Sequence, residues 1–542
     1  MGRSRARLRS AWLLPAALPA RWRSAVRGPA LAAPKLWLAC VTAAAAGIIN
    51  AAAFPDLGWW PLVIPGTALM LWSLRARRAG GGFLVGLIGG FAFFGTHIFW
   101  LTVYLGPVPW LALAGLQSVF FGFGAMLMAL AWRTVPALWP GRIGRLLLLP
   151  LVLAGLWTLR EAITSVWPYG GFSWGRLAFS QSASPLGHLV AWIGISGLSF
   201  VLAALAAIAL QALLEVRLSG LARAIAVVAA FAVVAVVPAW PVASSGSFRV
   251  AAVQGASDAG LFAQHQPGQT LQDHLRETIP LIGETVDLVV WPENAADIDP
   301  LRDGASARAL DRITADMNAP LVTGTITEDA RGRLFNSLLL WKSGEGAVAQ
   351  YDKIHPVPFA EYLPDRQFWY PFAPSLFDLV PRDYAIGTRP NVFDINHVLA
   401  GVAICFDIVD DGLIHQMIDT GAQVILAPTN NADFGHTDES VQQLAIARLR
   451  AMETSRSVVN ISTVGTSAII APDGSTIAAL PTWTPGSMVE TVPLSDAITP
   501  AMMFGRELEW LLTGLSFAAL VVATVVDRRR LSVGRRSGGR RG

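Results

Sequence analysis

Eight apolar segments, each close to the length that crosses a bilayer, constrain the fold of this chain more than any other feature. A spanning helix needs about 20 mostly apolar residues. We place the predicted spans at about 36–54, 59–74, 80–104, 108–132, 146–163, 186–214, 221–240 and 508–526. Of the 542 residues, 53% are hydrophobic and only 14% are charged, against about 25% charged in an average soluble protein. The sequence therefore predicts a multi-pass α-helical membrane protein.

Charge is divided sharply along the chain. Residues 247–500 hold 31 Asp and Glu against 15 Lys and Arg, whereas the remainder has a net charge of +20. Arginines follow alternate spans: Arg75, Arg77, Arg78, Arg133, Arg142, Arg145, Arg217 and Arg223. Positive loops mark the cytoplasmic side, which predicts cytoplasmic termini and an extracytoplasmic acidic block. The basic excess therefore belongs beside the membrane and does not indicate a nucleic-acid-binding surface.

These patterns predict five regions along the chain. They are a basic cytoplasmic tail at 1–35, a transmembrane domain of about seven helices at 36–240, a soluble domain at 247–500, a C-terminal transmembrane helix at 507–527 and a basic cytoplasmic tail at 528–542. A secretory signal peptide is the alternative interpretation of residues 11–20, but that apolar core is short and has arginines on both sides.

Residues 247–500 alternate between strand and helix patterns. Strands are predicted at 248–253, 286–291, 321–325, 338–341, 397–405, 424–427, 458–462 and 467–470, and helices at 271–284, 306–317 and 439–455. The sequence Pro472-Asp473-Gly474 is typical of a hairpin turn. Such alternation predicts a layered α/β domain.

Cys405 ends one of the apolar runs of this domain, in Ile-Cys-Phe-Asp at 404–407. Reactive groups in α/β folds commonly lie at the carboxyl ends of strands. The chain has only one other cysteine, Cys40, inside a predicted span, so no disulfide framework is available. Inert packing is the alternative, because free cysteines are among the most buried residues.

Glu293 and Lys353 also follow β-rich runs and can supply what a cysteine nucleophile needs. A thiol requires a base or a positive field to ionise at neutral pH. Glu293 can act as that base, and Lys353, with the backbone N–H of Phe406, can stabilise an oxyanion. Alternatively, the glutamate caps a helix or pairs with a cation, and the lysine is a solvated surface charge.

The order Glu, Lys, Cys in these contexts resembles the nitrilase (carbon–nitrogen hydrolase) superfamily. The matching motifs are Trp-Pro-Glu at 291–293, Tyr-Asp-Lys at 351–353 and Ile-Cys-Phe-Asp at 404–407. Spans on both sides narrow the resemblance to the bacterial apolipoprotein N-acyltransferases. Further similar stretches lie at 171–181, 357–362, 429–435 and 443–456. The resemblance implies an α-β-β-α sandwich inserted between membrane helices.

Two residues depart from the family pattern. Asp407 stands where the family usually has glutamate, so its side chain is one methylene shorter. Asp433 replaces a tryptophan in Asn430-Asn431-Ala432-Asp433-Phe434-Gly435. The departures leave the three predicted catalytic residues unchanged and affect expectations about the rim of the acyl-binding site.

The resemblance implies ping-pong acyl transfer from a phospholipid, through a Cys405 thioester, to the amino group of a diacylglyceryl-cysteine in an apolipoprotein. Glu361 matches a second essential glutamate of the family, and we expect it to orient Lys353; an ordinary loop carboxylate is the alternative. The reaction implies no cofactor, and no metal-ligand cluster stands out in the sequence. The implied location is a bacterial inner or plasma membrane, with the catalytic domain on its extracytoplasmic side.

Aromatic residues crowd the segment at 356–377, which we interpret as a membrane-dipping lid. Amphipathic rings favour the headgroup interface; packing on the domain core is the alternative. Candidate substrate-binding residues in this lid and in nearby loops are Phe359, Trp369, Phe372, Asn430, Phe434 and Trp174.

Two other functions use the same residues differently. A membrane-tethered amidase or nitrilase would need only one anchor helix, so seven preceding spans count against it. A transporter or lipid-binding protein with a degenerate nitrilase domain is disfavoured because Glu293, Lys353 and Cys405 are all present.

Overall fold

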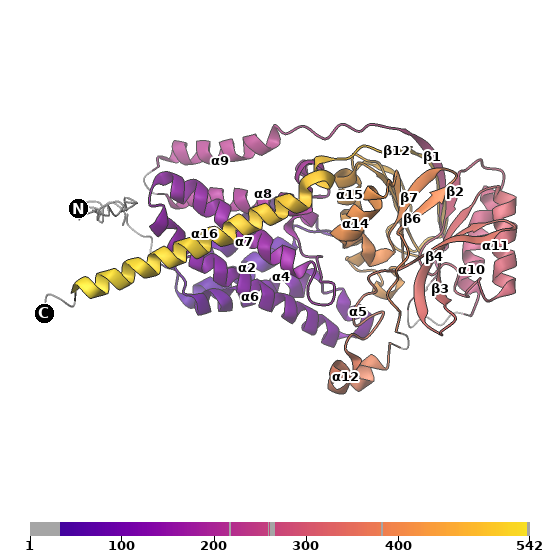
Figure 1. Ribbon diagram of the computed structural model, residues 1–542, viewed down its shortest axis with the longest axis horizontal. Helices are drawn as coiled ribbons and strands as arrows, with labels where there is room; N and C mark the ends of the chain where they lie inside the picture. Colours follow the sequence, from indigo (N-terminus) through magenta and orange to yellow (C-terminus); the bar gives the residue numbers. More distant parts are fainter. Residues whose placement is uncertain (1–32, 216–217, 258–259, 261–265, 381–382, 539–542) are drawn as a thin grey trace, which may run out of the picture.

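The computed structural model describes residues 33–538 except 216–217, 258–259, 261–265 and 381–382. A helical unit and an α/β unit lie end to end (Figure 1). The chain builds most of the helical unit first, forms the α/β unit, and returns through one last helix. Most of the predicted N-terminal tail lies outside the described residues.

Each predicted span corresponds to a helix. The helices are α2 (Leu36–Ala51), α3 (Val63–Ser73), α4 (Ala79–His97), α6 (Pro107–Leu138), α7 (Leu149–Thr164), α8 (Val190–Leu214), α9 (Gly220–Ala235) and α16 (Pro500–Gly538). Five of them, α4, α6, α7, α8 and α16, with their adjoining turns, are long and apolar enough to cross a membrane. The other three have only 10–17 residues. Among the described residues, five helices of spanning length therefore stand where eight spans were predicted.

The boundaries of the third span differ from the prediction. The segment expected at 80–104 is helix α4, which ends at His97, followed by a separate short helix, α5 (Leu101–Leu105). Periodicity could not detect this break because the residues on both sides of it are apolar.

Small residues bring α4 against α6. Gly82, Gly86 and Gly90 recur every fourth residue and face α6. A Cβ atom at Gly82 would lie 2.6 Å from the Cβ of Ala129, and one at Gly90 would lie 2.6 Å from the Cβ of Phe121. Because small residues at this spacing let helix backbones approach closely, the glycines fix the helix pair at the centre of the unit.

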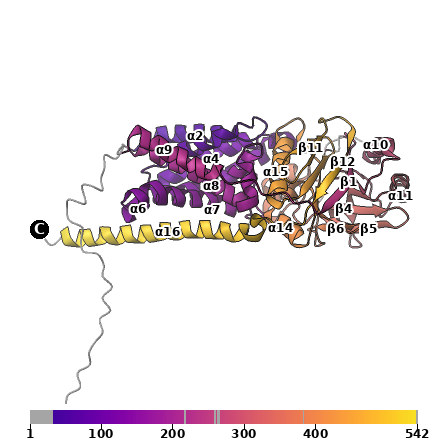
Figure 2. The ribbon, with the colours of Figure 1, turned by 90° about the horizontal axis from the view of Figure 1, so that it is seen from above.

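Helix α16 runs along α6, α7 and α8 and its far end projects away from the α/β unit (Figures 1 and 2). The helix begins at Pro500, beside the α/β unit, and includes Arg528 and Arg529 near its other end. The chain therefore enters the α/β unit after α9 and leaves it through α16.

The α/β unit contains two six-stranded mixed sheets. The first has the order β12-β1-β2-β3-β4-β5 and the second β11-β10-β9-β8-β7-β6. Strands β1, β2 and β3 are parallel in the first sheet, as are β7, β8 and β9 in the second, with antiparallel neighbours outside them. The strands are β1 (Gly246–Gln254), β2 (Leu288–Val290), β3 (Leu321–Glu328), β4 (Leu334–Lys342), β5 (Gly346–Asp352), β6 (Val392–Ile395), β7 (Val398–Val402), β8 (Val424–Thr429), β9 (Ser457–Ser462), β10 (Ala468–Ile470), β11 (Thr476–Ala479) and β12 (Gly486–Leu494).

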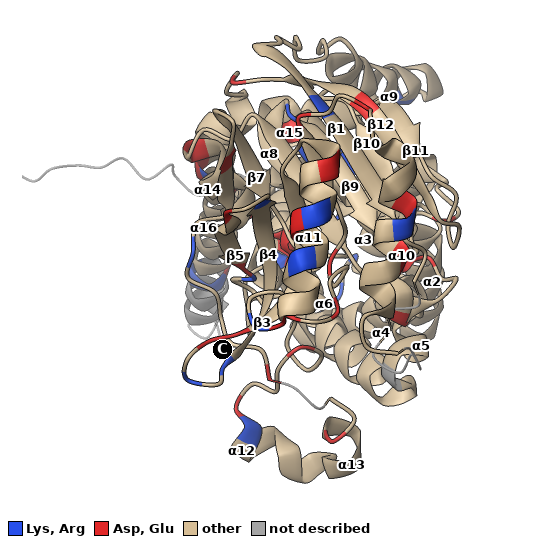
Figure 3. Cartoon of the chain, turned by 90° about the vertical axis from the view of Figure 1, so that its right-hand side faces the viewer, with Lys and Arg blue, Asp and Glu red and all other residues tan. Residues whose placement is uncertain are grey.

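Helices cover the outer face of each sheet and form the predicted layered α/β architecture. Side chains from both sheets, including Val250, Leu338 and Val424, form the core between them. Helices α10 (Gln269–Thr278) and α11 (Gly304–Met317) pack on the first sheet. Figure 3 views the molecule from this end and marks charged residues along both helices.

The second sheet faces the helical unit through α14 (Asp411–Asp419) and α15 (Glu439–Thr454). Gln442 of α15 accepts hydrogen bonds from the indole N–H groups of Trp100 and Trp174, and donates to the carbonyls of Pro55 and His97. Buried polar groups need such partners, so one glutamine side chain connects three segments of the helical unit to the α/β unit.

Candidate active site

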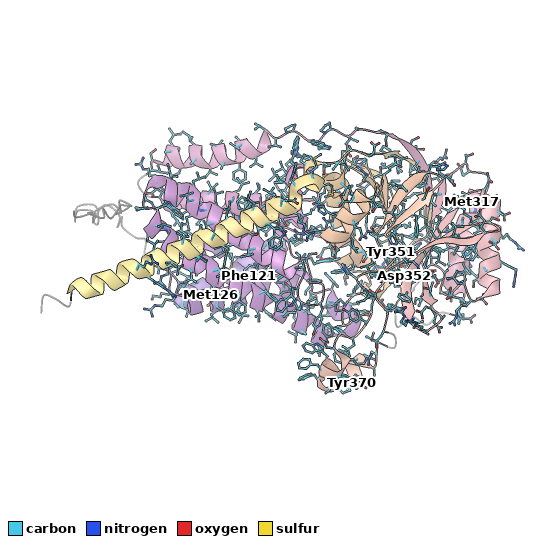
Figure 4. The ribbon with its side chains drawn as sticks, in the orientation of Figure 1. Phe121, Met126, Met317, Tyr351, Asp352 and Tyr370 are labelled. Carbon is cyan, nitrogen blue, oxygen red and sulfur yellow. The ribbon has the colours of Figure 1, made fainter. Side chains whose placement is uncertain are left out.

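The three predicted catalytic residues follow strands whose ends meet between the sheets. Glu293 comes after β2, Lys353 directly after β5 and Cys405 shortly after β7. Glu293 and Lys353 are 5% and 1% exposed, and Cys405 is partly buried. Figure 4 labels Tyr351 and Asp352, which lead into Lys353 in the middle of the α/β unit. Two sheets thus bring together residues separated by more than a hundred positions.

Glu293 is a buried carboxylate held by an amide from a neighbouring strand. Its Oε1 accepts a hydrogen bond of 2.6 Å from Nδ2 of Asn336 on β4. Burial is the main cause that raises the pKa of Glu293, while Lys353 opposes that rise. Gly324 makes this position possible, because a Cβ there would lie 2.5 Å from the Cα of Glu293. A carboxyl with a raised pKa is suited to general base chemistry near neutral pH.

Lys353 pairs with Glu361. Its Nζ lies 2.8 Å from Oε2 of Glu361, whose Oε1 accepts a 2.7 Å hydrogen bond from Asn336. Burial disfavours the ammonium ion, but Glu361 first and Glu293 next outweigh burial and raise the pKa of Lys353. Lys353 is therefore a fixed positive charge at the centre of the site.

Cys405 begins the 3-10 turn Cys405–Val409, with φ of 50°. Few residues other than glycine adopt this left-handed backbone conformation, and such outliers cluster at functional sites. Burial first, and Glu293 second, raise the pKa of its thiol, whereas Lys353 opposes them. A thiol in this setting depends on a base for its ionisation.

Asp407 and Phe406 support the turn on different sides. Oδ2 of Asp407 accepts hydrogen bonds from the hydroxyl of Tyr351 at 2.9 Å and from the N–H of Ile404 at 3.1 Å. Burial raises the pKa of Asp407 to about 7. Asp407, although one methylene shorter than the usual glutamate, therefore has hydrogen-bond partners within the α/β unit. Phe406 stacks on Trp174, with ring centroids 6.0 Å apart.

The remaining loop candidates surround this turn. Trp174 is buried beneath Phe406, and Phe434 packs edge-on against Trp100, 5.1 Å between centroids. Oδ1 of Asn430 accepts hydrogen bonds from the Thr463 hydroxyl and the Ala432 N–H. Trp174 and Asn430 therefore have structural partners already, while Phe434 joins the helical unit to the site.

The lid segment, residues 356–377, forms short turns outside the core. Phe368 and Phe372 are 59% and 72% exposed. The alternative prediction, that the aromatic rings of this segment pack on the domain core, is therefore wrong. Trp369 donates a 3.1 Å hydrogen bond to the hydroxyl of Tyr169, and its ring packs edge-on against Phe359. The segment around Tyr370 projects sideways where the two units meet (Figures 1 and 4).

Two parts of the site were not assigned a role from the sequence. Asn336 bridges Glu293 and Glu361, and Gln443 of α15 places its Nε2 3.6 Å from the sulfur of Cys405. The signal for Asn336 was one amide inside the apolar strand Leu-Phe-Asn-Ser-Leu-Leu-Leu-Trp. Gln443 begins the family-like stretch at 443–456, but the pattern of that helix does not distinguish a buried amide from a surface one.

A buried arginine fixes the far end of the 3-10 turn Cys405–Val409. Arg450 donates to the carbonyls of Ile408 and Val409 at 3.0 and 2.9 Å, and pairs with Asp411 at 2.6 Å. Asp411 also pairs with Arg176 of the helical unit at 2.7 Å. Both arginines lower the pKa of Asp411, overcoming its burial. The turn that carries Cys405 is thereby connected to the helical unit by charge.

A small pocket lies beside the turn. Its lining includes Tyr169, Ser173, His355, Phe406 and Asp407. The pocket thus lies between the loop after α7, the start of the lid segment and the turn Cys405–Val409. In the described part of the chain, no group of three His, Cys, Asp or Glu side chains could hold a metal ion.

Comparisons with known proteins agree with the division into two units. Residues 46–208 match the family described as "Apolipoprotein N-acyltransferase N-terminal domain", and residues 249–499 match "Carbon-nitrogen hydrolase". An amidase from Nesterenkonia sp. aligns at 17% identity and a TM-score of 0.36, over 47% of this chain and 94% of that one.

Full-length relatives share the name apolipoprotein N-acyltransferase. The protein from Mycolicibacterium smegmatis is 31% identical, covering 88% of this chain and 83% of the relative. The protein from Pseudomonas aeruginosa strain LESB58 is 30% identical, and the match covers 90% of this chain and 96% of the relative. The protein from Photobacterium profundum is 26% identical, and the match covers 90% of this chain and 94% of the relative. Since identity extends across both units, the chain belongs to the apolipoprotein N-acyltransferase family.

Proposed function

We propose that this enzyme transfers an acyl chain from a phospholipid to the N-terminal diacylglyceryl-cysteine of apolipoproteins, through a thioester on Cys405. The observation that carries the proposal is the buried set of Glu293, Lys353 and Cys405 inside a unit joined at both ends to apolar helices. A nucleophile, a base and a fixed cation are the parts that acyl transfer needs. Membership of the family supplies the class of substrates.

In the first half-reaction Glu293 accepts the proton of the Cys405 thiol, and the sulfur attacks the ester carbonyl carbon of the lipid. Lys353 and the N–H of Phe406 stabilise the resulting oxyanion. Collapse breaks the bond from carbon to the glycerol oxygen, which takes the proton from Glu293. The lysophospholipid leaves, and the acyl chain remains on the sulfur.

In the second half-reaction the acceptor amine attacks the thioester carbonyl, and the bond from carbon to sulfur breaks. Glu293 accepts a proton from the attacking nitrogen, and the expelled Cys405 thiolate then takes it back. Glu361 keeps Lys353 in place through both steps with its 2.8 Å ion pair. The same residues thus serve both halves, as a ping-pong reaction requires.

The helical unit would place this chemistry at the outer membrane surface. In our proposal all eight apolar helices lie within a bacterial membrane, with both termini in the cytoplasm. The contact of Gln442 with the His97 carbonyl supports this, because it locates the end of α4 at the catalytic unit and its arginine-rich start at the far side. Arg145 likewise pairs with Glu215 at the ends of α7 and α8 that lie away from the catalytic unit. Positive loops gather on the cytoplasmic side.

The lid segment would cover the site from the lipid side. Its exposed rings, Phe368 and Phe372, suit the headgroup region, where aromatic side chains settle. Phe359 and Trp369 form its inner face through contact with Tyr169. Excluding water here protects the thioester from hydrolysis. Asn430, Phe434 and Trp174 would shape the acyl-binding side of the site.

The test is product formation from lipid substrates. Purified protein mixed with a phospholipid and a diacylated lipopeptide should give lysophospholipid and triacylated lipopeptide in equal amounts, and Cys405→Ser should give neither. Hydrolysis of small amides without lipopeptide acylation would instead support a membrane-tethered amidase. A wild-type protein that yields no product from either substrate would refute the catalytic proposal.

A further inference from the structure

A neutral hydrogen-bonded network lies on the side of Cys405 that α15 covers. Gln443 places its Nε2 3.6 Å from the Cys405 sulfur, and its Oε1 accepts from Nδ2 of Asn431 at 2.8 Å. Gln443 and Asn431 are each 2% exposed. Neither amide reaches bulk water, so their protein partners decide which way each one points.

The Ser462 hydroxyl links the backbone to this network. Its oxygen accepts a hydrogen bond from the N–H of Gly465 at 3.0 Å. The same hydroxyl donates its proton to Oδ1 of Asn431, 2.7 Å away. Since a carbonyl oxygen only accepts, the NH₂ group of Asn431 lies on its other side.

That NH₂ group in turn orients Gln443. Nδ2 of Asn431 donates to Oε2 of Glu439 at 2.7 Å and to Oε1 of Gln443 at 2.8 Å. The Thr429 hydroxyl lies 3.0 Å from the same Gln443 oxygen. A flipped Gln443 would place its NH₂ against the NH₂ of Asn431 and leave buried donors unpaired, which is costly. The network therefore holds an N–H of Gln443 toward the sulfur.

We propose that Gln443 is a catalytic hydrogen-bond donor to the Cys405 sulfur, and that Asn431 and Ser462 are positioning residues that lock its amide. The donor stabilises the thiolate when it forms and again when it is expelled from the thioester. Its role when the thiolate is expelled from the thioester rests on the proposed acyl transfer. A neutral donor does this without placing a second cation near Glu293, where a cation would keep the base ionised and weaken it.

The electrostatic setting makes this donor necessary. Burial, Glu293 and Glu439 all raise the pKa of the Cys405 thiol, and Lys353 opposes them while paired with Glu361. The Thr429 hydroxyl has one proton, which can turn to the sulfur or to Gln443. Gln443 adds a donor whose direction does not depend on the state of the sulfur.

The experiment measures the reactivity of Cys405 directly. In a Cys40→Ser background, Cys405 is the one remaining cysteine of the two, and its iodoacetamide alkylation rate over a pH series gives the pKa of its thiol. Gln443→Met keeps the length of the side chain and removes the donor. We expect the pKa to rise by about 1, the effect of losing one hydrogen bond to a charged group, and thioester formation to slow roughly tenfold.

Gln443→Glu and Leu444→Met make the result specific. Glu has the shape of Gln but adds a negative charge beside the sulfur, so the thiol pKa should rise in the order wild type, Gln443→Met, Gln443→Glu. Leu444→Met, a volume-conserving change at the next position of α15, should leave both the pKa and the activity unchanged. A role in packing alone would not produce this order.

Asn431→Leu tests the lock. It should raise the thiol pKa as Gln443→Met does, and the double variant should show no further rise because both changes remove the same interaction. Alkylation curves that coincide for wild type, Gln443→Met and Gln443→Glu overturn the proposal. Alkylation needs no lipid, so this outcome is separate from a failure of wild-type acyl transfer, which would count against the proposed function alone.

Discussion

The two sheets supply different chemistry to the two sides of Cys405. The first sheet places ionisable groups there: Glu293, Lys353 and, through the lid segment, Glu361, joined by Asn336. The second sheet places amides and hydroxyls there, through Thr429, Asn431 and Gln443. One side can move protons and balance charge, whereas the other can hold the sulfur without changing charge.

This difference explains why the site tolerates a buried cation next to a buried base. Asn336 donates to both Glu293 and Glu361 from one NH₂ group, so the two carboxylates share a donor, and Lys353 pairs with Glu361. Unpaired buried charges cost several kcal/mol, and a second cation on the α15 side would upset this balance. The neutral side therefore complements the charged side.

The largest loss should follow removal of the base on the charged side. Glu293→Gln keeps an acceptor for Asn336 but cannot take the thiol proton, so thioester formation should fall roughly 10³-fold. Rapid-quench mass spectrometry of the acyl-enzyme measures the rate. Retention of most of the wild-type rate by a folded variant would transfer the role of base to another group.

Removing the cation should have the next largest effect. Lys353→Met should lower the rate of thioester formation roughly 10²-fold, because the oxyanion loses its charged partner. The melting temperature should fall too, since Glu361 loses its 2.8 Å ion pair. Lys342→Met, on strand β4 of the same sheet, is the matched control and should change neither quantity. Equal losses in the two variants would contradict a specific role for Lys353.

Asn336 should tune the base. Asn336→Leu leaves the Glu293 carboxylate without its 2.6 Å donor, which disfavours the ionised form and raises the pKa of Glu293 further. The base is active when ionised, so the acid limb of the rate profile should move to higher pH by about 1, with roughly tenfold loss at neutral pH. A pH series of acyl-enzyme formation measures this shift. A uniform loss at every pH would mean that Asn336 only supports the fold.

The lid segment should matter only with membrane substrates. Trp369→Ser combined with Phe372→Ser should reduce turnover of phospholipid in vesicles several-fold, because exposed rings lose their place in the headgroup region. Turnover of a short-chain donor in detergent should stay near the wild-type value. If the variant and the wild type turn over each donor at the same rate, the lid segment has no role in the use of membrane substrates.

The smallest effect should come from Glu439, at the outer end of the neutral network. Burial raises its folded-state pKa to about 8, whereas in an unfolded chain glutamate titrates near 4. The folded protein therefore holds a proton that the unfolded chain has released, and stability falls as pH rises from about 5 to about 8. Glu439→Gln does not titrate, so its melting temperature in detergent should fall less over this range. An identical pH dependence would show that Glu439 ionises normally.

The sequence predicted the charged side of the site better than the neutral side. Glu293, Lys353 and Cys405 stood in short motifs at the ends of apolar runs, and the strands do bring them together. Asn336 and Gln443 act through tertiary contacts between strand and helix positions that look ordinary in a single sequence. Their roles depend on which neighbour's donor faces which acceptor, and only the fold determines that.

The fold shows the same division between local and non-local signals. Strongly apolar segments, such as β1 (Gly246–Gln254) and β8 (Val424–Thr429), and the long helix α15 were predicted close to their observed positions. Strands β5, β6 and β12, which all lie at sheet edges, were missed because alternation with polar residues is weak evidence there. Apolar helices lie where the spans were predicted, but five rather than eight are long enough to cross a membrane, and their lengths depend on breaks such as that after His97.

The most direct test of the account is the mass of the protein after incubation with phospholipid alone. We predict an acyl-sized gain on the Cys405 peptide that hydroxylamine removes, that a diacylated lipopeptide discharges onto its own amine, and that Cys405→Ser never shows. A wild-type protein that forms triacylated lipopeptide without any acyl group on Cys405, even under rapid quench, would contradict a thioester mechanism. That result would require direct transfer between the two lipids instead.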